Sequence, residues 1–160
     1  MQDIKQEIMK NVVNQMGSFE FEPTIGYVWE LSRLKSLENW TMEKPSAEEM
    51  AEAGFYCPNP DVPDVVKCFS CFIELDGWEP TDKPWNEHRK RALTLNPPCK
   101  FIEIGKKEMD CSVNDFLEIQ KSVALRSFKE KCEKNLKTML ALHKKQKSSL
   151  KKELQKLGVS

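Results

Sequence analysis

Apolar side chains recur every three or four residues in two stretches of the chain, and this spacing predicts amphipathic helices. The first stretch is residues 3–16, with Ile4, Ile8 and Val12 on the same helical face as Met9, Val13 and Met16. The second follows Ser112 and continues to residue 157 without Gly or Pro. At 1.5 Å per residue that helix is about 60 Å long, too long to pack on a small domain. Half of its apolar stripe should therefore contact another chain.

Between these stretches the pattern first stays helical. Residues 27–37 carry apolar side chains at three-residue steps, which predicts a helix over that range. Ser46 and Glu49 have the spacing of a capping box, in which a hydroxyl and a carboxylate close the first turn of a helix. We expect this second helix to be short and to end at Gly54.

The pattern then becomes typical of strands. Short apolar runs at 55–56, 65–69 and 72–75 predict three antiparallel strands, with a Pro-rich turn between the first two. Pro84 suits the first turn of a further helix that continues through His88 to about residue 93. The sequence therefore predicts an α+β fold, in which a small domain with a three-stranded antiparallel sheet and short helices precedes one long C-terminal α-helix.

This pattern divides the chain into four parts. Residues 1–26 form an N-terminal leader, expected to be an amphipathic helix plus a connector, and residues 27–104 form the small domain. A linker over 105–111 leads to the long helix, residues 112–157.

Composition adds a charge asymmetry to this picture. The net charge is zero, with 25 Lys and Arg against 25 Asp and Glu. Residues 1–119 nevertheless carry 13 basic against 22 acidic side chains, and residues 120–160 carry 12 against 3. The acidic region, residues 1–119, favours cationic ligands. The basic region, residues 120–160, could contact nucleic acid, an anionic partner or only water.

Six cysteines raise the question of whether the thiols form disulfides or bind metal. The first residues are charged where a signal peptide needs an apolar segment, so we expect an intracellular protein with reduced thiols. Cys68 and Cys71 have Cys-x₂-Cys spacing, and His88 and Cys99 follow. These four residues can complete a Cys₃His zinc tetrahedron. The alternatives are a chance pair, which the later His88 and Cys99 argue against, and a thioredoxin-like redox pair, which needs a βαβ pattern that does not surround Cys68 and Cys71.

Several motifs, in one order along the chain, resemble the baculoviral repeat (BIR) of the inhibitor-of-apoptosis family, survivin type. The resemblance covers roughly residues 27–104, and the long helix after a single repeat fits the same type. The matching residues are Arg33, Trp40, Met50 to Phe55, Asp64 to Cys71, Leu75 to Pro80, Asp82, Pro84, Glu87 and His88. The resemblance implies a fold with a three-stranded sheet, short helices and one structural Zn²⁺.

The spacing of the last two ligands departs from the family. Ten residues separate His88 from Cys99, whereas the family usually has six. Four extra residues are close to one helical turn, so a longer helix could return the chain at nearly the same angle. Cys111 is the only nearby substitute for Cys99, and Lys100 and Phe101 match the family's continuation better.

The resemblance also implies a groove that binds a peptide with a free N-terminal Ala. The corresponding residues are Leu75, Asp76, Trp78 and Asp82. Carboxylates can bind the α-ammonium by charge-assisted hydrogen bonds that an internal peptide segment cannot make. Without the family, Asp76 would be a turn residue, Trp78 part of the core and Asp82 a surface charge.

In survivin-type proteins this groove binds a histone tail that starts Ala-Arg-Thr, with the threonine phosphorylated. Two positions near the phosphate fall on Ile73 and Arg91. An Ile cannot pair with phosphate, whereas an Arg can, by bidentate contact. Phosphate recognition is therefore a hypothesis that Arg91 favours and Ile73 weakens.

For the long helix, the resemblance implies a three-helix bundle with borealin and the inner centromere protein, through which Aurora B kinase is recruited. A homodimer near the linker is a further expectation by analogy. Candidate residues for these contacts are Val113, Phe116, Leu125, Phe128, Leu136 and Met139. The Lys-rich end of the helix is more simply a solvated face than a DNA contact.

No catalytic motif is present, and a zinc with four protein ligands has no open position, so we expect a non-enzyme without membrane contact. Two functions remain open. The first is a chromosomal passenger subunit acting in mitosis and cytokinesis, at the centromere and spindle midzone with a cytoplasmic pool. The second is an apoptosis inhibitor that binds caspases or Ala-started peptides. A single repeat with a long helix favours the first.

Overall fold

A three-stranded antiparallel sheet lies at the centre of the small domain in the computed structural model, which describes residues 23–156. The strands are β1 (Phe55–Tyr56), β2 (Val66–Cys68) and β3 (Glu74–Leu75), in the order β1-β2-β3. Phe55 pairs with Cys68, and Val66 pairs with Leu75. The predicted α+β architecture is confirmed, although β2 and β3 are shorter than the apolar runs that predicted them.

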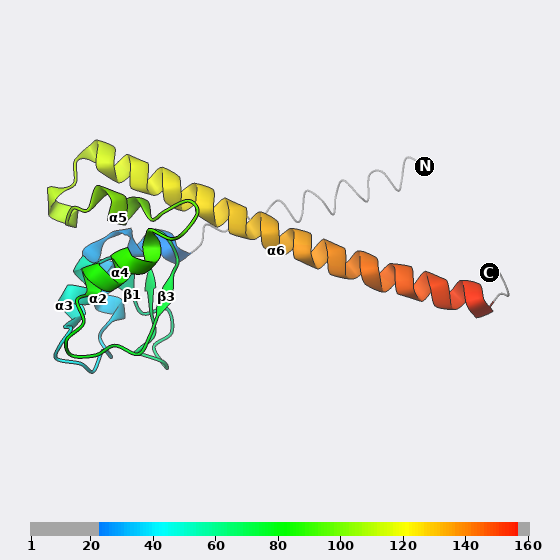
Figure 1. The fold of residues 1–160 in the computed structure, drawn as a ribbon, viewed down its shortest axis with the longest axis horizontal. Coiled ribbons are helices and arrows are strands. Elements are labelled where there is room, and N and C mark those ends of the chain that lie inside the picture. The colour runs from blue at the N-terminus through cyan, green and yellow to red at the C-terminus, as the bar shows by residue number, and fades with distance from the viewer. Residues whose placement is uncertain (1–22, 157–160) are drawn as a thin grey trace.

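Short helices surround this sheet, and one long helix follows them (Figure 1). The 3₁₀ helices are η1 (Pro23–Val28) and η2 (Glu108–Asp110), and the α-helices are α2 (Glu30–Ser36), α3 (Ala47–Glu52), α4 (Pro84–Ala92), α5 (Lys100–Ile104) and α6 (Val113–Lys156). The amphipathic helix expected over residues 3–16 lies outside the described residues.

Local signals place the helices that frame the site. The Ser46 hydroxyl accepts from the Glu49 backbone N–H, and the Glu49 carboxylate accepts from the Ser46 N–H, so the predicted capping box starts α3. Gly54 follows with φ of 89°, a conformation that disfavours side chains. Pro84 is the first residue of α4, as expected.

The helix expected over residues 27–37 is interrupted. Trp29 is extended, so that η1 ends at Val28 and α2 begins at Glu30. The cause is Arg33, whose Nη1 donates to the carbonyl oxygens of Tyr27 at 3.0 Å and Val28 at 2.7 Å. Those two carbonyls therefore bond to a side chain instead of continuing a helical ladder.

Arg33 is a buried charge at the edge of the core, with 1% of its surface exposed. Its Nε donates to the Ala51 carbonyl at 2.8 Å, and its Nη2 lies 3.5 Å from the Glu108 carboxylate. The guanidinium also lies 4.7 Å from the centre of the Phe69 ring. Burial lowers the pKa of Arg33, and the nearby Glu108 opposes that shift.

Helix α6 packs on the domain only near its start and then projects away from it (Figure 1). Ile119 and Val123 are buried, whereas the apolar residues farther along are exposed. Met139, for example, has 67% of its surface exposed. This exposure leaves the distal part of the stripe available to another chain, and the contact itself stays a prediction.

Candidate metal centre and peptide groove

Cys68, Cys71, His88 and Cys99 converge on one point inside the domain. Their ligand atoms all lie within 4.8 Å of one another, and all four residues are buried. Cys68 ends β2, Cys71 lies in the turn before β3, and His88 projects from α4. Cys99 directly precedes α5. The predicted clustering of these four residues is confirmed.

Backbone groups hold these donors in place. His88 Nδ1 lies 2.8 Å from the Ala53 carbonyl oxygen, which leaves Nε2 directed at the cluster, 3.5 Å from Cys71 Sγ. The N–H groups of Ser70 and Cys71 both point at Cys68 Sγ, at 3.3 and 3.4 Å. A ring nitrogen bonded to a carbonyl and thiolates that accept backbone N–H groups are typical outer-shell arrangements of metal sites.

The donor set fits zinc. Zn–S bonds near 2.3 Å and Zn–N bonds near 2.0–2.1 Å place a tetrahedral N···S edge at about 3.6 Å, close to the His88–Cys71 separation. Burial raises the pKa of the Cys68 thiol, so a nearby cation is needed to keep a thiolate there. This buried Cys₃His cluster is consistent with a structural zinc site.

The ten-residue gap before Cys99 does not displace the fourth donor. After α4 ends at Ala92, residues 93–98 form a loop, and the Cys99 N–H returns to the Ala92 carbonyl at 3.3 Å. Cys111, the alternative considered from the sequence, lies in a different cavity beside the start of α6. The extra residues are therefore accommodated in the loop between α4 and α5.

A small hollow of about 40 Å³ lies between β3 and α4. All five residues predicted for peptide binding line it, together with Gly77 and Glu87. The five are Leu75, Asp76, Trp78, Asp82 and Arg91. We call this hollow the groove. That these residues bind a peptide stays a prediction, although the fold brings them together.

The structure bears differently on the turn at Asp76 and on the core position of Trp78. Residues 76–79 form no turn, although Gly77 has φ of 64°, a conformation that favours glycine. Trp78 is partly buried and packs against the core. The Trp78 ring packs edge-on against Phe55, with 5.6 Å between ring centres. The Trp78 indole nitrogen is buried and has no hydrogen-bond partner among the described residues. Trp78 is thus both a core residue and a wall of the groove.

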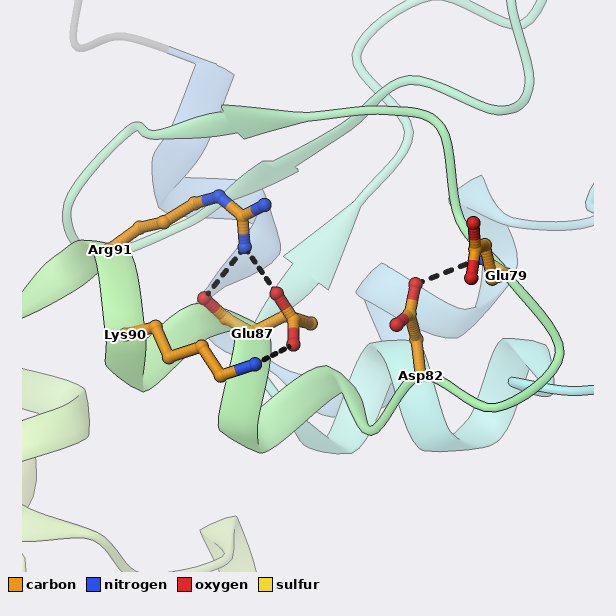
Figure 2. A network of polar contacts seen from close by, with 5 residues as sticks. All are labelled: Glu79, Asp82, Glu87, Lys90 and Arg91. Carbon is orange, nitrogen blue, oxygen red and sulfur yellow. Dashed lines mark hydrogen bonds and ion pairs between the residues drawn. The ribbon is translucent and has the colours of Figure 1, made fainter.

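Glu87 lies in the groove, which the sequence analysis did not predict. Its carboxylate binds two cations of its own helix, Lys90 at 2.6 Å and Arg91 at 2.5 Å (Figure 2). Both hydrogen bonds lower the pKa of Glu87. The i,i+3 and i,i+4 spacings in a predicted helix were the signal that could have identified this cluster.

Asp82 is held by the turn that precedes α4. Its Oδ2 accepts a hydrogen bond from the Glu79 backbone N–H at 2.9 Å, and Figure 2 shows its carboxylate on the side opposite Arg91. The groove therefore has carboxylates at Asp76, Asp82 and Glu87 and a single guanidinium, at Arg91.

Comparison with protein-family models gives a match over residues 33–103 to BIR, the Inhibitor of Apoptosis domain. Baculoviral IAP repeat-containing protein 5 of Mus musculus is 38% identical over 110 residues, which is 64% of this chain and 76% of the mouse protein. The Rattus norvegicus protein of the same name is 37% identical over 117 residues, covering 68% of this chain and 77% of the relative.

Baculoviral IAP repeat-containing protein 5.2-A of Xenopus laevis is 42% identical over 106 residues, 61% of this chain. That match spans 65% of the Xenopus protein's length, slightly under two thirds. Among the helices of residues 23–156, none has the length and apolar content that a membrane crossing requires. Proteins of this kind are generally non-catalytic. The chain therefore belongs to the survivin family, that of baculoviral IAP repeat-containing protein 5.

Proposed function

We propose that this protein is a survivin-like subunit of a chromosomal passenger complex, with two separate binding surfaces. The groove binds the free N-terminal Ala of a histone tail. Helix α6 binds borealin-like and inner-centromere-protein-like helices, which recruit Aurora B kinase in mitosis and cytokinesis. The observation that carries the proposal is the combination of an acidic groove with a projecting amphipathic helix in one chain.

The charges of the groove support the choice of ligand. Asp76 and Asp82 lie in one hollow, and an α-ammonium can bond to both because it has three donors. Trp78 offers an aromatic wall for the Ala methyl group, and its buried N–H has no hydrogen-bond partner within the part of the chain that the structure describes. An N-acetylated or internal segment has no ammonium and would leave these carboxylates without a cation.

The zinc belongs to the proposal as a structural element. Cys68, Cys71, His88 and Cys99 would hold one Zn²⁺ with no open position, which fixes β3 and α4 on either side of the groove. The ion would supply folding free energy rather than chemistry.

Calorimetric titration of the zinc-loaded full chain tests the groove. Three peptides that start Ala-Arg-Thr are needed: unmodified, N-acetylated and phosphorylated on the threonine. The proposal expects the N-acetylated peptide to lose most of the affinity, because it cannot make the charge-assisted hydrogen bonds that an ammonium makes to Asp76 and Asp82, each of which contributes up to about 1.5–3 kcal/mol. Equal affinity for the free and acetylated peptides would contradict it.

Pull-down from mitotic extract tests the helix. Leu136 and Met139 lie on the exposed apolar stripe, and Thr138 and Ala141 lie on the opposite face of α6. Leu136→Asp with Met139→Asp should abolish recovery of the two partner helices. The matched pair Thr138→Asp with Ala141→Asp should not, since it adds the same charge to the solvated face.

The alternative function is an apoptosis inhibitor that binds caspases or pro-apoptotic Ala-started peptides through the same groove. The exposed apolar length of α6 favours the passenger function, because inhibition through the groove does not use it. If the Leu136 and Met139 variant recovers the same partners as the wild type while peptide binding persists, the result favours the apoptosis-inhibitor function and contradicts the passenger function.

A further inference from the structure

A second cavity, of about 270 Å³, lies where α6 begins. Its walls come from the junction of η1 and α2, from the core and from the start of α6. The lining is mainly apolar and includes Val28, Trp29, Phe69, Cys111, Val113 and Phe116. We call it the α6 cavity. It is several times larger than the groove and shares no residue with it.

The rim of the α6 cavity is an exposed apolar surface. Val113 has 78% of its surface exposed and Trp29 has 53%, although the Trp29 ring stacks on Phe116 with 5.3 Å between ring centres. Leu117, the next residue on α6, is 58% exposed. Trp29 and Val113 both line the cavity, and exposed apolar side chains beside a cavity are typical of a site that another segment covers.

The charged groups of the cavity are already paired with one another. Glu108 Oε2 lies 3.5 Å from Arg33 Nη2 and also accepts from the Glu30 backbone N–H at 2.5 Å. Arg33 has three further backbone acceptors. Because neither charge needs an external partner, the cavity suits an apolar occupant rather than an ionic ligand.

The N-terminal segment of the same chain provides such an occupant. The pattern of residues 4–16 predicts one apolar face made of Ile, Val and two Met side chains, and Met adapts to irregular cavities. Residues 1–22 connect directly to η1, whose last residue, Val28, lines the cavity. The tether is therefore anchored at the cavity wall.

The connection to η1 is long enough for residues 4–16 to reach the α6 cavity. A connection over residues 17–22 spans up to about 20 Å when extended, and η1 adds about 12 Å at 2.0 Å per residue. A tether this short gives an effective concentration in the millimolar range. A second copy or a free peptide at micromolar concentration would have to bind about a thousandfold more tightly to displace it.

We propose that the apolar face of residues 4–16 docks in the α6 cavity of its own chain. The docked segment covers Val113 and Phe116, so it competes with any homodimer formed through those residues. The inference is independent of the groove and its ligand.

Cys111 reports the docking directly. It lines the cavity and is partly exposed, whereas Cys132 is exposed on α6 far from the cavity and serves as an internal reference. The measurement is the alkylation rate of each thiol in the zinc-loaded full chain, read by peptide mass spectrometry. Zinc content and circular dichroism are checked in parallel to verify folding.

Three chains are compared: the wild type, a variant with Ile8→Asp and Val12→Asp, and a control with Asn11→Asp and Asn14→Asp. On a helix, Ile8 and Val12 lie on the apolar face and the two Asn residues lie outside it. Docking predicts that the first variant raises the Cys111 rate about tenfold relative to Cys132, which corresponds to about 90% occupancy in the wild type. The control should leave the ratio unchanged.

Two results would overturn the proposal. Equal Cys111 rates in all three chains would mean that the segment does not cover the cavity. Protection of Cys111 that increases with protein concentration would assign the cavity to a second copy instead. Docking within one chain requires protection that is independent of concentration, and Val12→Cys should then cross-link to Cys111 within a monomer whereas Asn14→Cys should not.

Discussion

The guanidinium of Arg126 lies 2.6 Å from the carbonyl oxygen of Pro97, and the same nitrogen is 3.3 Å from the Pro98 carbonyl oxygen. Arg126 belongs to α6, and the two prolines immediately precede Cys99. The loop that lengthens the gap between His88 and Cys99 is thus hydrogen-bonded to α6 of the same chain. Arg126 therefore links α6 to the loop that leads to Cys99 of the Cys₃His cluster.

Replacing Arg126 tests that connection. Arg126→Ala removes charge-assisted hydrogen bonds that are partly exposed to water, so we expect a loss of about 1 kcal/mol in unfolding free energy and a Tm lower by about 2–4 °C. Zinc should also transfer faster to a chelator, because the loop before Cys99 loses its anchor. Lys121→Ala, an exposed α6 residue, is the matched control. If zinc transfer is equally fast in both variants, the loop is held by other contacts.

Removal of a cluster ligand should unfold the small domain rather than weaken a function. Cys99→Ser leaves three donors in a buried site, and structural zinc contributes about 10–16 kcal/mol in comparable small domains. We expect the wild type to hold one zinc per chain and Cys99→Ser to lose it, with loss of cooperative thermal unfolding. Cys111→Ser should retain the metal, since Cys111 lies in the α6 cavity. A Cys99→Ser chain with full zinc content would exclude Cys99 as a ligand.

Short-range patterns predicted the parts of the fold whose cause lies within a few residues. Ser46 and Glu49 are three positions apart, Pro84 acts on its own helix, and Cys68 and Cys71 form one tight turn. Each of these features needs only local backbone geometry. The family resemblance then supplied the groove, whose residues come from β3, α4 and the loop between them.

Features that depend on distant residues could not be predicted in this way. In the sequence, Arg33 stands only as a residue that matches the family, and its burial against Glu108, 75 positions later, could not be predicted from the local pattern. The break at Trp29 follows from the same burial, since the guanidinium takes the carbonyls that a continuous helix would use. No periodicity in residues 27–37 carries that information.

The buried Arg33 should be one of the most sensitive positions outside the cluster. Arg33→Met removes the donor to three carbonyl oxygens and leaves Glu108 without its cation, so we expect a loss of about 3–5 kcal/mol in unfolding free energy. Glu108→Gln keeps an acceptor for the Glu30 N–H and should cost clearly less. Urea unfolding of the zinc-loaded chain measures both. Equal losses would mean that the ion pair, and not the carbonyl bonds, dominates.

Peptide affinity should depend on pH through the ligand rather than the groove. Lys90 and Arg91 lower the pKa of Glu87, so its carboxylate stays ionised throughout the neutral range. The α-amino group of a peptide has a pKa of about 7.7–8.0 and loses its charge above it. Affinity for an unmodified Ala-Arg-Thr peptide should therefore fall as the pH rises through about 8. An affinity that stays flat from pH 6.5 to pH 9 would contradict ammonium recognition.

Arg91 should determine whether a phosphorylated threonine is preferred. Its Nη1 bonds to the Glu87 carboxylate, which orients the side chain at the groove, and its remaining donors can reach a ligand (Figure 2). Ile73 is packed against the core and offers no charge. Because Arg91 is the only cation that lines the groove among residues 23–156, Arg91→Ala should reduce any preference for the phosphorylated peptide to a ratio of about one.

The matched variants separate charge from geometry. Arg91→Lys keeps the charge but loses the bidentate guanidinium, so this variant should retain part of the preference for the phosphorylated peptide. Arg89→Ala removes a cation of the same helix that does not line the groove, so this variant should retain the full preference. Ile73→Lys adds a second cation next to the start of β3 and should increase the preference for the phosphorylated peptide. If Arg91→Ala binds phosphorylated and unmodified peptides with the same ratio as the wild type, phosphate recognition through Arg91 is wrong. Ammonium recognition by Asp76 and Asp82 would then stand on its own, because carboxylates bind an ammonium and repel a phosphate.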